Sequence, residues 1–402
     1  MKKFFRSPAK ILVFISLAFS SSIFYADTPS NIPQPTAPSA PPQIIPSPPN
    51  VNSKSYILID ANSGKVIAEK NSEERLPPAS LTKVMTLYVV SNALNNKQIH
   101  LNDNVRISET AWKIGGSRMF VKEGQMVAIK DLLKGVIVDS GNDACVALAE
   151  HLGGSEEGFT ELMNSQAKSL GLNNTHFTDS TGLPSNDLYT TAKDLSVLAR
   201  ALINNFPQYY HWYKEKWFTF NEIRQPNRNR LLWRDGQVDG IKTGFTNDAG
   251  YCLISSAKRG DMRLIAVVLH APTESTRADD SEKLLNYGFR FYETHQLYKA
   301  NQAISKVKIY KGDNDSIDVG VLKDNFITIP SGQYSRLVIS TKIPNFIEAP
   351  IEKGQQIGEL VVKFDDNVIE TQSLYALSDE KAGGMYTRAV GSIKIMFARW
   401  FG

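Results

Sequence analysis

The segment from Leu76 to Val90 constrains this chain more than any other. Two prolines open it, Ser80 and Lys83 follow, and a mainly apolar run completes it. Prolines directly before an apolar run are typical of a loop that turns into a helix, so the segment predicts a helix with Ser80 in its first turn. Residues three apart share one helix face, which brings the Ser80 and Lys83 side chains together.

Such a pair suits nucleophilic catalysis. A serine hydroxyl reacts poorly at neutral pH without an adjacent base, and lysine can be that base where burial and nearby positive charge lower its pKa. The start of a helix also offers backbone N–H groups to a developing oxyanion. The S-x-x-K spacing alone does not identify a site, because solvated pairs share it and it recurs at Ser7, Ser165, Ser255, Ser305 and Ser378.

Two further motifs single out Ser80. An S-x-N turn at residues 140–142 precedes a helical pattern, and K-T-G occupies residues 242–244 in a strand-like run. Strand patterns at 251–256 and 263–270 follow, so K-T-G is expected on an antiparallel sheet. Glycine at the third position of K-T-G would let a ligand backbone approach closely.

The first 26 residues predict an export signal. Four basic residues and no acidic one occur there, and an uncharged apolar run extends from Ile11 to Tyr25, with Ala26 as a candidate cleavage residue. This run is about 15 residues long, whereas a spanning helix needs about 20; an uncleaved anchor is the alternative. Residues 27–53 predict an extended tether or, alternatively, a docking peptide, because 28–53 contain nine prolines and no charged residue.

The net charge changes once this signal is set aside. The 402 residues include 45 Lys and Arg against 41 Asp and Glu, and removal of the signal would leave 41 of each sign. That balance argues against a nucleic-acid partner. Two cysteines exclude a disulfide scaffold, and the six histidines lack the spacing of a helical or finger-type zinc site.

The three motifs, in this order, resemble those of the penicillin-binding proteins and serine β-lactamases. The likeness is greatest to the low-molecular-mass penicillin-binding proteins that act as D-alanyl-D-alanine carboxypeptidases, and it extends from about residue 54 to the C-terminus. It is carried by the stretches SGNDACVALAE, NTHF, YKEKWFTFNEIRQPNRNRLLW, VDGIKTG and LLNYGFRFYE. The resemblance implies an α+β fold with a catalytic transpeptidase-like domain at 54–296, in which an antiparallel sheet packs with helices.

The resemblance also implies a catalytic role for each motif residue. Ser80 would be the acylated nucleophile and Lys83 its base. Ser140, supported by Asn142, would pass a proton to the leaving D-alanine. Lys242 would polarise that serine and attract the substrate carboxylate.

The substrate-binding residues that the resemblance implies are Thr243, Gly244, Phe245, Arg228 and Arg277. Thr243 would hydrogen-bond the carboxylate, and the backbone N–H groups of Phe245 and the nucleophile would form the oxyanion hole. Arg228 and Arg277 match arginines near the family's carboxylate site, although each could instead be a surface charge. No cofactor and no metal is implied.

Two departures and two cysteines need comment. Some relatives carry histidine where this chain has Phe245, but acylation needs only a backbone N–H there. No E-x-x-x-N element occurs where β-lactamases keep their deacylating glutamate, which favours slow release of a penicilloyl adduct. Cys145 and Cys252 could form a disulfide, supply a thiol near the site, or be two buried apolar side chains.

A change of pattern near residue 297 predicts a second domain. Residues 297–378 contain short strand patterns separated by Gly, Pro, Asn or Asp, which predicts a small β-sandwich without chemical motifs. These patterns lie at 305–310, 316–321, 325–329, 336–341, 357–363 and 368–371. Spacing and protein contact are both possible roles for it.

The last segment, residues 379–402, predicts an amphipathic helix. From Met385 onward it has three positive charges and no acid. Such a helix suits an anionic membrane interface, and packing on the protein is the alternative. The expected apolar face comprises Tyr386, Ala389, Val390, Ile393, Phe397, Trp400 and Phe401.

Together these features predict an exported enzyme at the periplasmic face of the inner membrane. It would remove the terminal D-alanine from the pentapeptide stems of peptidoglycan through a Ser80 acyl-enzyme, act in cell-wall biogenesis, and be acylated by β-lactams. The alternatives are a D,D-endopeptidase, a β-lactamase, and a scaffold protein with a vestigial site.

Overall fold

The computed structural model describes residues 25–26 and 45–401. Residues 1–24 of the predicted signal peptide and residues 27–44 of the predicted linker therefore lie outside the described residues. Contacts divide the chain into two units, and each is described by itself. Of the described residues, 45–298 and 324–336 form the larger unit, which therefore includes a segment that the sequence pattern placed in the second domain. Residues 25–26, 299–323 and 337–401 form the C-terminal unit.

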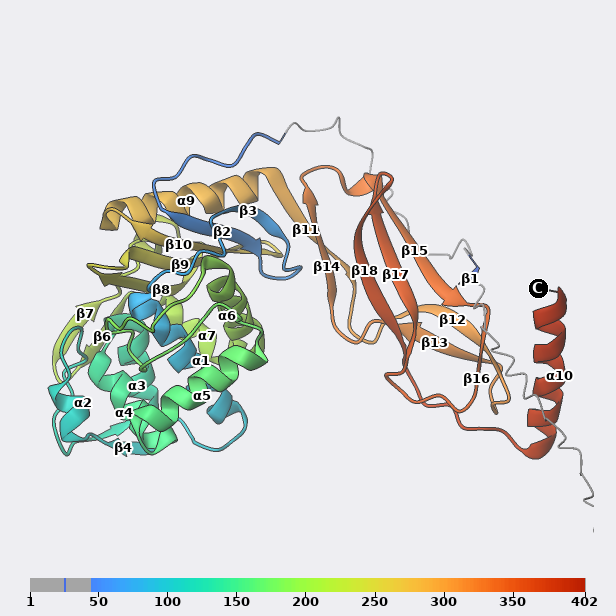
Figure 1. The fold of residues 1–402 in the computed structure, drawn as a ribbon, viewed down its shortest axis with the longest axis horizontal. Helices are drawn as coiled ribbons and strands as arrows, with labels where there is room; N and C mark the ends of the chain where they lie inside the picture. Colours follow the sequence, from blue (N-terminus) through green and yellow to red (C-terminus); the bar gives the residue numbers. More distant parts are fainter. Residues whose placement is uncertain (1–24, 27–44, 402) are drawn as a thin grey trace, which may run out of the picture. The chain divides into compact units, whose positions relative to one another are not determined.

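A five-stranded antiparallel sheet forms the centre of the larger unit (Figure 1). One face of the sheet is covered by α9 (Glu274–Phe291) and the other by a lobe of helices. Every residue of β2 is consequently buried. The strand order is β3-β2-β10-β9-β8, with β2 Ser55–Asp60, β3 Val66–Lys70, β8 Val238–Thr246, β9 Gly250–Arg259 and β10 Met262–Ala271.

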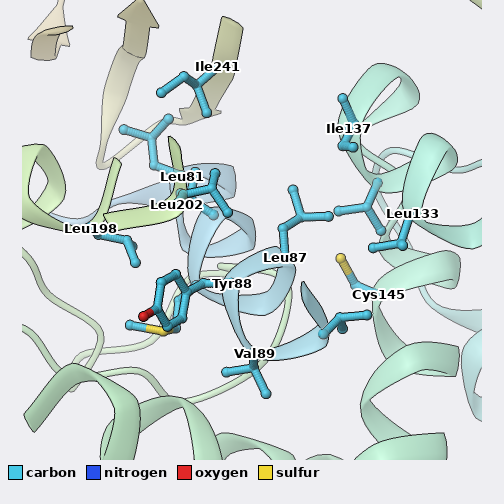
Figure 2. Packing of buried hydrophobic residues seen from close by; sticks show 14 of the residues in the cluster. Leu81, Leu87, Tyr88, Val89, Leu133, Ile137, Cys145, Leu198, Leu202 and Ile241 are labelled. Carbon is cyan, nitrogen blue, oxygen red and sulfur yellow. The ribbon is translucent and has the colours of Figure 1, made fainter. Parts of the chain in front are cut away.

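Helix α1 (Lys83–Asn95) runs through the middle of the helical lobe, where it is buried on nearly all sides. Figure 2 shows Leu87 of α1 facing Leu133 and Ile137, while Leu198 and Leu202 lie on the other side of the helix. A helix that is apolar all round is stable only in such an enclosed position. Because α1 is held from every side, the residues at its start are held as well.

The remaining elements of the lobe are mostly short. Helices α4 and α5 pack together beside α1, and α6 packs on the sheet. The bounds are η1 Ala79–Thr82, β4 Asn104–Arg106, α2 Glu109–Lys113, β5 Met126–Ala128, α3 Ile129–Lys134, η2 Gly135–Asp139, α4 Asn142–Gly153, α5 Glu156–Ser169, α6 Ala192–Asn205, α7 Pro207–Tyr210, η3 His211–Lys214, β6 Trp217–Phe220, β7 Ile223–Pro226 and α8 Leu231–Arg234.

A two-stranded ribbon of β11 (Tyr292–Tyr298) and β14 (Asn325–Pro330) also belongs to the larger unit, followed by the short helix η4 (Tyr334–Arg336). Side chains tie the ribbon to the β2–β3 hairpin. The Thr294 hydroxyl donates to an Asp60 carboxylate oxygen at 2.8 Å, and the Ser63 and Thr328 hydroxyls lie 2.6 Å apart. These contacts explain why a strand that follows residue 324 clusters with the larger unit.

The C-terminal unit is an all-β domain with one helix, as predicted. Hydrogen bonds connect its described strands in the order β1-β15-β17-β18-β13-β12-β16. The strands are β1 Tyr25–Ala26, β12 Ala303–Tyr310, β13 Ser316–Gly320, β15 Leu337–Pro344, β16 Phe346–Glu348, β17 Gln356–Phe364 and β18 Asn367–Ala376.

Helix α10 (Met385–Phe401) ends the described chain. It lies on its own domain through Gly391, whose Cα approaches Lys311 of the neighbouring loop so closely that a Cβ would lie 2.9 Å from the Lys311 nitrogen. Ile395, one turn on, is 6% exposed. Within the described part of the chain, no helix has both the length and the apolar character to cross a bilayer.

Candidate active site

Ser80 lies in η1, a single 3₁₀ turn that leads directly into α1. The predicted helix is thus confirmed, but its first turn is 3₁₀ and the α-helix begins at Lys83. Ala79, just before the serine, has a φ of +49°, a left-handed conformation that is strained for a residue with a side chain. The Lys83 Nζ donates a hydrogen bond to Ser80 Oγ at 2.9 Å, as the i, i+3 spacing predicted.

Lys83 is entirely buried. Burial is the main reason that its pKa is lowered, and the positive charge of Arg228 lowers the pKa further, against the opposing charges of Asp179 and Asp143. A lowered pKa increases the neutral fraction of the amine, and only a neutral amine can take a proton from a serine. Besides the serine, Nζ donates to the carbonyl oxygen of Thr181 at 2.8 Å.

The loop that supplies this carbonyl was not anticipated from the sequence. One oxygen of Asp179 accepts hydrogen bonds from the backbone N–H groups of Thr181, at 2.6 Å, and Gly182, at 2.7 Å. Gly182 has a φ of +83°, and a Cβ there would lie 1.9 Å from the carbonyl oxygen of Ala79. The loop therefore packs directly against η1. The sequence signal for such a turn is D-S-T-G at residues 179–182, because aspartate side chains commonly accept hydrogen bonds from backbone N–H groups in turns.

Ser140 stands between the π-turn η2 and helix α4, with a φ of +61°. This left-handed residue interrupts the helical path, and both features are common at functional sites. The side chain of Asn142 donates to the carbonyl oxygen of Gly115 at 2.6 Å. Asp143 accepts the backbone N–H groups of Met119 and Phe120, each at 2.8 Å. Asn142 and Asp143 thus hold the loop at 115–121 beside Ser140.

The K-T-G strand is β8, which ends the order of the five-stranded sheet. A Cβ at Gly244 would lie 2.9 Å from the Pro78 carbonyl oxygen and 3.2 Å from the Ser80 nitrogen. The sequence predicted that this glycine admits a ligand backbone, but the closest atoms belong to η1 itself. The glycine therefore allows β8 to lie directly against the turn that carries Ser80.

Lys242 is 3% exposed, and its Nζ donates to the Thr243 carbonyl oxygen at 3.3 Å. Burial, followed by the charges of Lys83 and Arg228, lowers the Lys242 pKa well below its ordinary value. Burying a second lysine where the charge of Lys83 lowers its pKa is costly to a fold, and a bound anion reduces that cost. The pair therefore points to an anionic ligand.

The two arginines occupy different environments. Arg228 is exposed at the pocket and is in none of the ion pairs found among the described residues. Arg277 is 5% exposed, donates to the Gly244 carbonyl oxygen at 3.2 Å, and pairs with Glu274 at 3.2 Å. Glu274 also pairs with Arg230 at 2.8 Å. Arg277 thus already supports the K-T-G strand, whereas Arg228 is available to a ligand.

These elements enclose a cavity of about 660 Å³. Phe245 is half exposed at its rim and stacks on Tyr251, with ring centroids 4.3 Å apart. Lys83, Asn142 and Lys242 lie buried behind its wall. The predicted residues that line the cavity are Ser80, Ser140, Arg228, Thr243, Gly244, Phe245 and Arg277, and the lining residues that the sequence did not suggest include Ser117, Trp233 and Glu274.

Both cysteines are free and fully buried. Burial raises the pKa of Cys145 to about 12 and that of Cys252 to about 11, so both remain thiols at neutral pH. Their disulfide is absent, and they pack as apolar side chains, one of the three options that the sequence left open. No group of three or more metal-ligating side chains occurs among residues 25–26 and 45–401.

Comparisons with known proteins match this geometry to a family. The family described as D-alanyl-D-alanine carboxypeptidase, peptidase S11, matches residues 42–273, and the C-terminal domain of penicillin-binding protein 5 matches residues 292–382. The chain is 45% identical over 362 residues to the D-alanyl-D-alanine carboxypeptidase DacC of Escherichia coli, covering 88% of this chain and 90% of that protein.

Solved structures agree. Penicillin-binding protein 5 of Haemophilus influenzae matches with a TM-score of 0.79 at 42% identity, covering 83% of this chain and 99% of that one. Penicillin-binding protein D2 of Listeria monocytogenes, solved in its ampicillin-bound form, matches with a TM-score of 0.56 at 31% identity over 60% of this chain and 99% of that one. The chain therefore belongs to the D-alanyl-D-alanine carboxypeptidase family of serine hydrolases, the low-molecular-mass penicillin-binding proteins, and carries the C-terminal domain of penicillin-binding protein 5.

Proposed function

We propose that this protein removes the terminal D-alanine from peptidoglycan pentapeptide stems through an acyl-enzyme on Ser80. The observation that carries the proposal is the 2.9 Å hydrogen bond between Lys83 Nζ and Ser80 Oγ, in a cavity whose other wall is cationic. A reactive serine beside a carboxylate-binding wall fits a peptide that ends in a free carboxylate.

In the acylation step, neutral Lys83 takes the proton of Ser80, and Oγ attacks the carbonyl carbon of the penultimate residue. Backbone N–H groups of Ser80 and Phe245 stabilise the oxyanion, which is possible because η1 and β8 lie against each other. The C–N bond then breaks, and the proton that Lys83 took from Ser80 passes through the Ser140 hydroxyl to the departing amine of D-alanine. Water then attacks the carbonyl carbon of the resulting ester, and the same groups pass its proton to Ser80 Oγ. The ester C–O bond breaks, which frees Ser80.

Positive charge holds the carboxylate of the terminal D-alanine of the substrate. Arg228 and Thr243 line the cavity where the D-alanine carboxylate would bind, and Lys242 lies buried behind its wall. Arg277 donates to the Gly244 carbonyl oxygen and so fixes the strand that presents Lys242 and Thr243. The carboxylate would also add a negative charge close to Lys242, whose pKa is lowered by burial and by the charges of Lys83 and Arg228. Substrates without a C-terminal carboxylate should therefore bind poorly.

β-Lactams should acylate the same serine, because they combine a reactive amide with a carboxylate. The ampicillin-bound form of the Listeria relative supports this, since that protein matches 60% of this chain at 31% identity. Among the described residues, Lys83 Nζ hydrogen-bonds to Ser80 Oγ and to the Thr181 carbonyl oxygen and to no carboxylate, an arrangement that favours slow release.

The proposed location is the periplasmic face of the inner membrane, reached by removal of the signal at 1–26 and with residues 27–53 as a tether. Helix α10 supports the location. Its face toward the domain holds Gly391 and Ile395, while Tyr386, Ile393 and Trp400 on the opposite face are 55–83% exposed. An apolar face directed away from its own domain suits a bilayer surface, and the exposed Arg388 and Lys394 of the same helix suit an anionic one.

The decisive experiment compares the wild type with Ser80→Ala on a synthetic pentapeptide that ends in D-Ala-D-Ala. Release of D-alanine by the wild type only, together with a penicilloyl adduct on Ser80 in mass spectra, is the expected result. Absence of both in a folded wild-type protein would refute the mechanism. Cleavage of cross-linked dimers without D-alanine release would indicate an endopeptidase, and rapid nitrocefin turnover a β-lactamase.

A further inference from the structure

A buried carboxylate next to Ser140 has no part in the mechanism above. Asp139 is the last residue of η2 and is 1% exposed. Its Oδ1 has no hydrogen-bond partner among the described residues. Buried carboxylates are nearly always paired or hydrogen-bonded, so this oxygen is an exception that requires an explanation.

The contrast with Asp143, four residues later, is informative. Both side chains are buried, but Asp143 accepts the backbone N–H groups of Met119, Phe120 and Val121, so its oxygens are hydrogen-bonded. Asp139 has no comparable donors. Its charge must therefore be balanced, if at all, by the cations of the cavity.

The charged groups that act on Asp139 are few. Arg228, on the loop after β7, and Lys242, on β8, favour its anionic form, whereas Asp143 on α4 disfavours it. Two other charged groups close to η2 have partners elsewhere: Lys134 of α3 pairs with Glu215 at 2.7 Å, and Arg224 of β7 lies over the Trp217 ring at 4.4 Å. A third, Arg118, belongs to the 115–121 loop that packs on Gly135 of η2, and its buried Nε has no hydrogen-bond partner among the described residues. Asp139 is thus coupled to the two cations assigned to the substrate carboxylate.

Burial raises the pKa of Asp139 to about 7, and Arg228 and Lys242 only partly oppose that effect. A carboxyl group with this pKa exchanges its proton at neutral pH. The cavity would therefore have one charge more or less depending on the pH of its surroundings.

We propose that Asp139 is a positioning residue that sets the charge of the carboxylate-binding wall. When Asp139 is protonated, Arg228 and Lys242 act on the substrate carboxylate in full. When it is ionised, it offsets part of their charge, and a ligand carboxylate binds more weakly. The inference rests on the proposed function for the identity of that ligand, but it applies equally to any carboxylate ligand that acylates Ser80.

The test compares the wild type with Asp139→Asn, which has the same shape without the charge. The measured quantity is the second-order rate of Ser80 acylation by a fluorescent penicillin, from about pH 5.5 to 8.5, so that the ratio of the two proteins cancels the shared titration of Lys83. The ratio of variant to wild type should be near one in acid and rise about three- to tenfold above neutrality. A ratio that stays constant with pH would overturn the proposal.

Controls separate this proposal from a folding defect and from the proposed function. Arg224→Gln removes a charge from the neighbouring β7 and should keep the wild-type pH profile of acylation. Asp139→Ala is the second variant in case asparagine packs poorly at this position, and it should give the same ratio of variant to wild type as Asp139→Asn. D-Alanine release from the pentapeptide is measured in parallel. If no D-alanine is released, the proposed carboxypeptidase function is refuted. The proposal for Asp139 is still tested in that case, because it is measured through acylation by penicillin.

Thermal denaturation gives a second measurement. Because the folded-state pKa of Asp139 exceeds the ordinary value near 4, the folded protein binds more protons between these two pH values. The contribution of Asp139 to stability must therefore fall as pH rises through this window. Asp139→Asn should remove that part of the fall, and an unchanged pH dependence of the melting temperature would contradict the raised proton affinity.

Discussion

The two units of this protein depart from ordinary burial in opposite directions. The larger unit buries charge: Lys83, Lys242, Asp139 and Asp143 are all at most 3% exposed. The C-terminal unit exposes apolar surface: Tyr386 and Trp400 of α10 are 83% and 82% exposed. Charges are rarely buried unless paired, and large apolar faces are rarely left in water.

Each departure has a cost that only a ligand removes. In the larger unit the buried lysines are desolvated and repel each other, which a bound carboxylate would offset. In the C-terminal unit the apolar face of α10 is exposed to water, and binding to a membrane surface would bury it. The difference identifies two kinds of ligand, an anion for one unit and a lipid interface for the other.

Lys83→Met should have the largest effect on this comparison. The substitution replaces the base with an apolar side chain of similar length. Acylation of Ser80 by penicillin should therefore slow by at least about 10³-fold. The free energy of unfolding should stay the same or rise, because a desolvated amine is replaced by an apolar group. Acylation kinetics and chemical denaturation provide the two numbers.

Loss of activity together with a loss of several kcal/mol in stability would break the comparison. It would mean that Lys83 is buried mainly for the fold. Lys113→Met is a control, because that lysine is exposed on α2 and pairs only with Glu109 on the same short helix. It should change neither the free energy of unfolding nor the activation free energy of acylation by more than about 0.5 kcal/mol.

Gly182→Ala tests the fit behind the nucleophile and should have the next largest effect. The new Cβ would clash with the Ala79 carbonyl oxygen at 1.9 Å, which must displace η1. Stability should fall by about 3 kcal/mol and acylation by about 10²-fold. Gly171→Ala is the matched control, because its φ is +74° but nothing lies within 4 Å, so it should cost only about 1 kcal/mol and leave acylation unchanged.

Much of this arrangement could be predicted from the sequence, because its signals are local. The i, i+3 spacing of Ser80 and Lys83 gave their contact, and alternating strand patterns gave β8, β9 and β10. All six strand patterns of residues 305–371 correspond to strands. The family resemblance then joined three motifs that lie 60 and 102 residues apart in sequence.

What could not be predicted depends on packing between distant segments. The approach of Gly182 to Ala79 joins residues 103 positions apart, and only the folded chain shows that a side chain has no room there. Asp139 and Asp143 look alike in sequence, yet one finds amide donors and the other does not. Ile395 interrupts the polar face of the tail pattern, and the structure explains why: that face packs on the domain, and Ile395 is buried there.

The smallest expected effect tests the exposed side of the comparison. Ile393 of α10 and Val368 of β18 are both β-branched, both 55% exposed and both in the C-terminal unit. If α10 lies in a bilayer surface, Ile393→Ser should weaken binding of the full chain to vesicles of anionic phospholipid about five- to tenfold, since about 1–1.5 kcal/mol of apolar burial is lost. Val368→Ser should leave binding unchanged, because exposure alone does not make a residue part of the interface. Equal effects of the two substitutions, in a sedimentation assay at constant salt, would mean that the apolar face of α10 has no special affinity for lipid. The exposed helix would then need a protein partner to explain it, and the contrast between an anion-binding unit and a membrane-binding unit would fail.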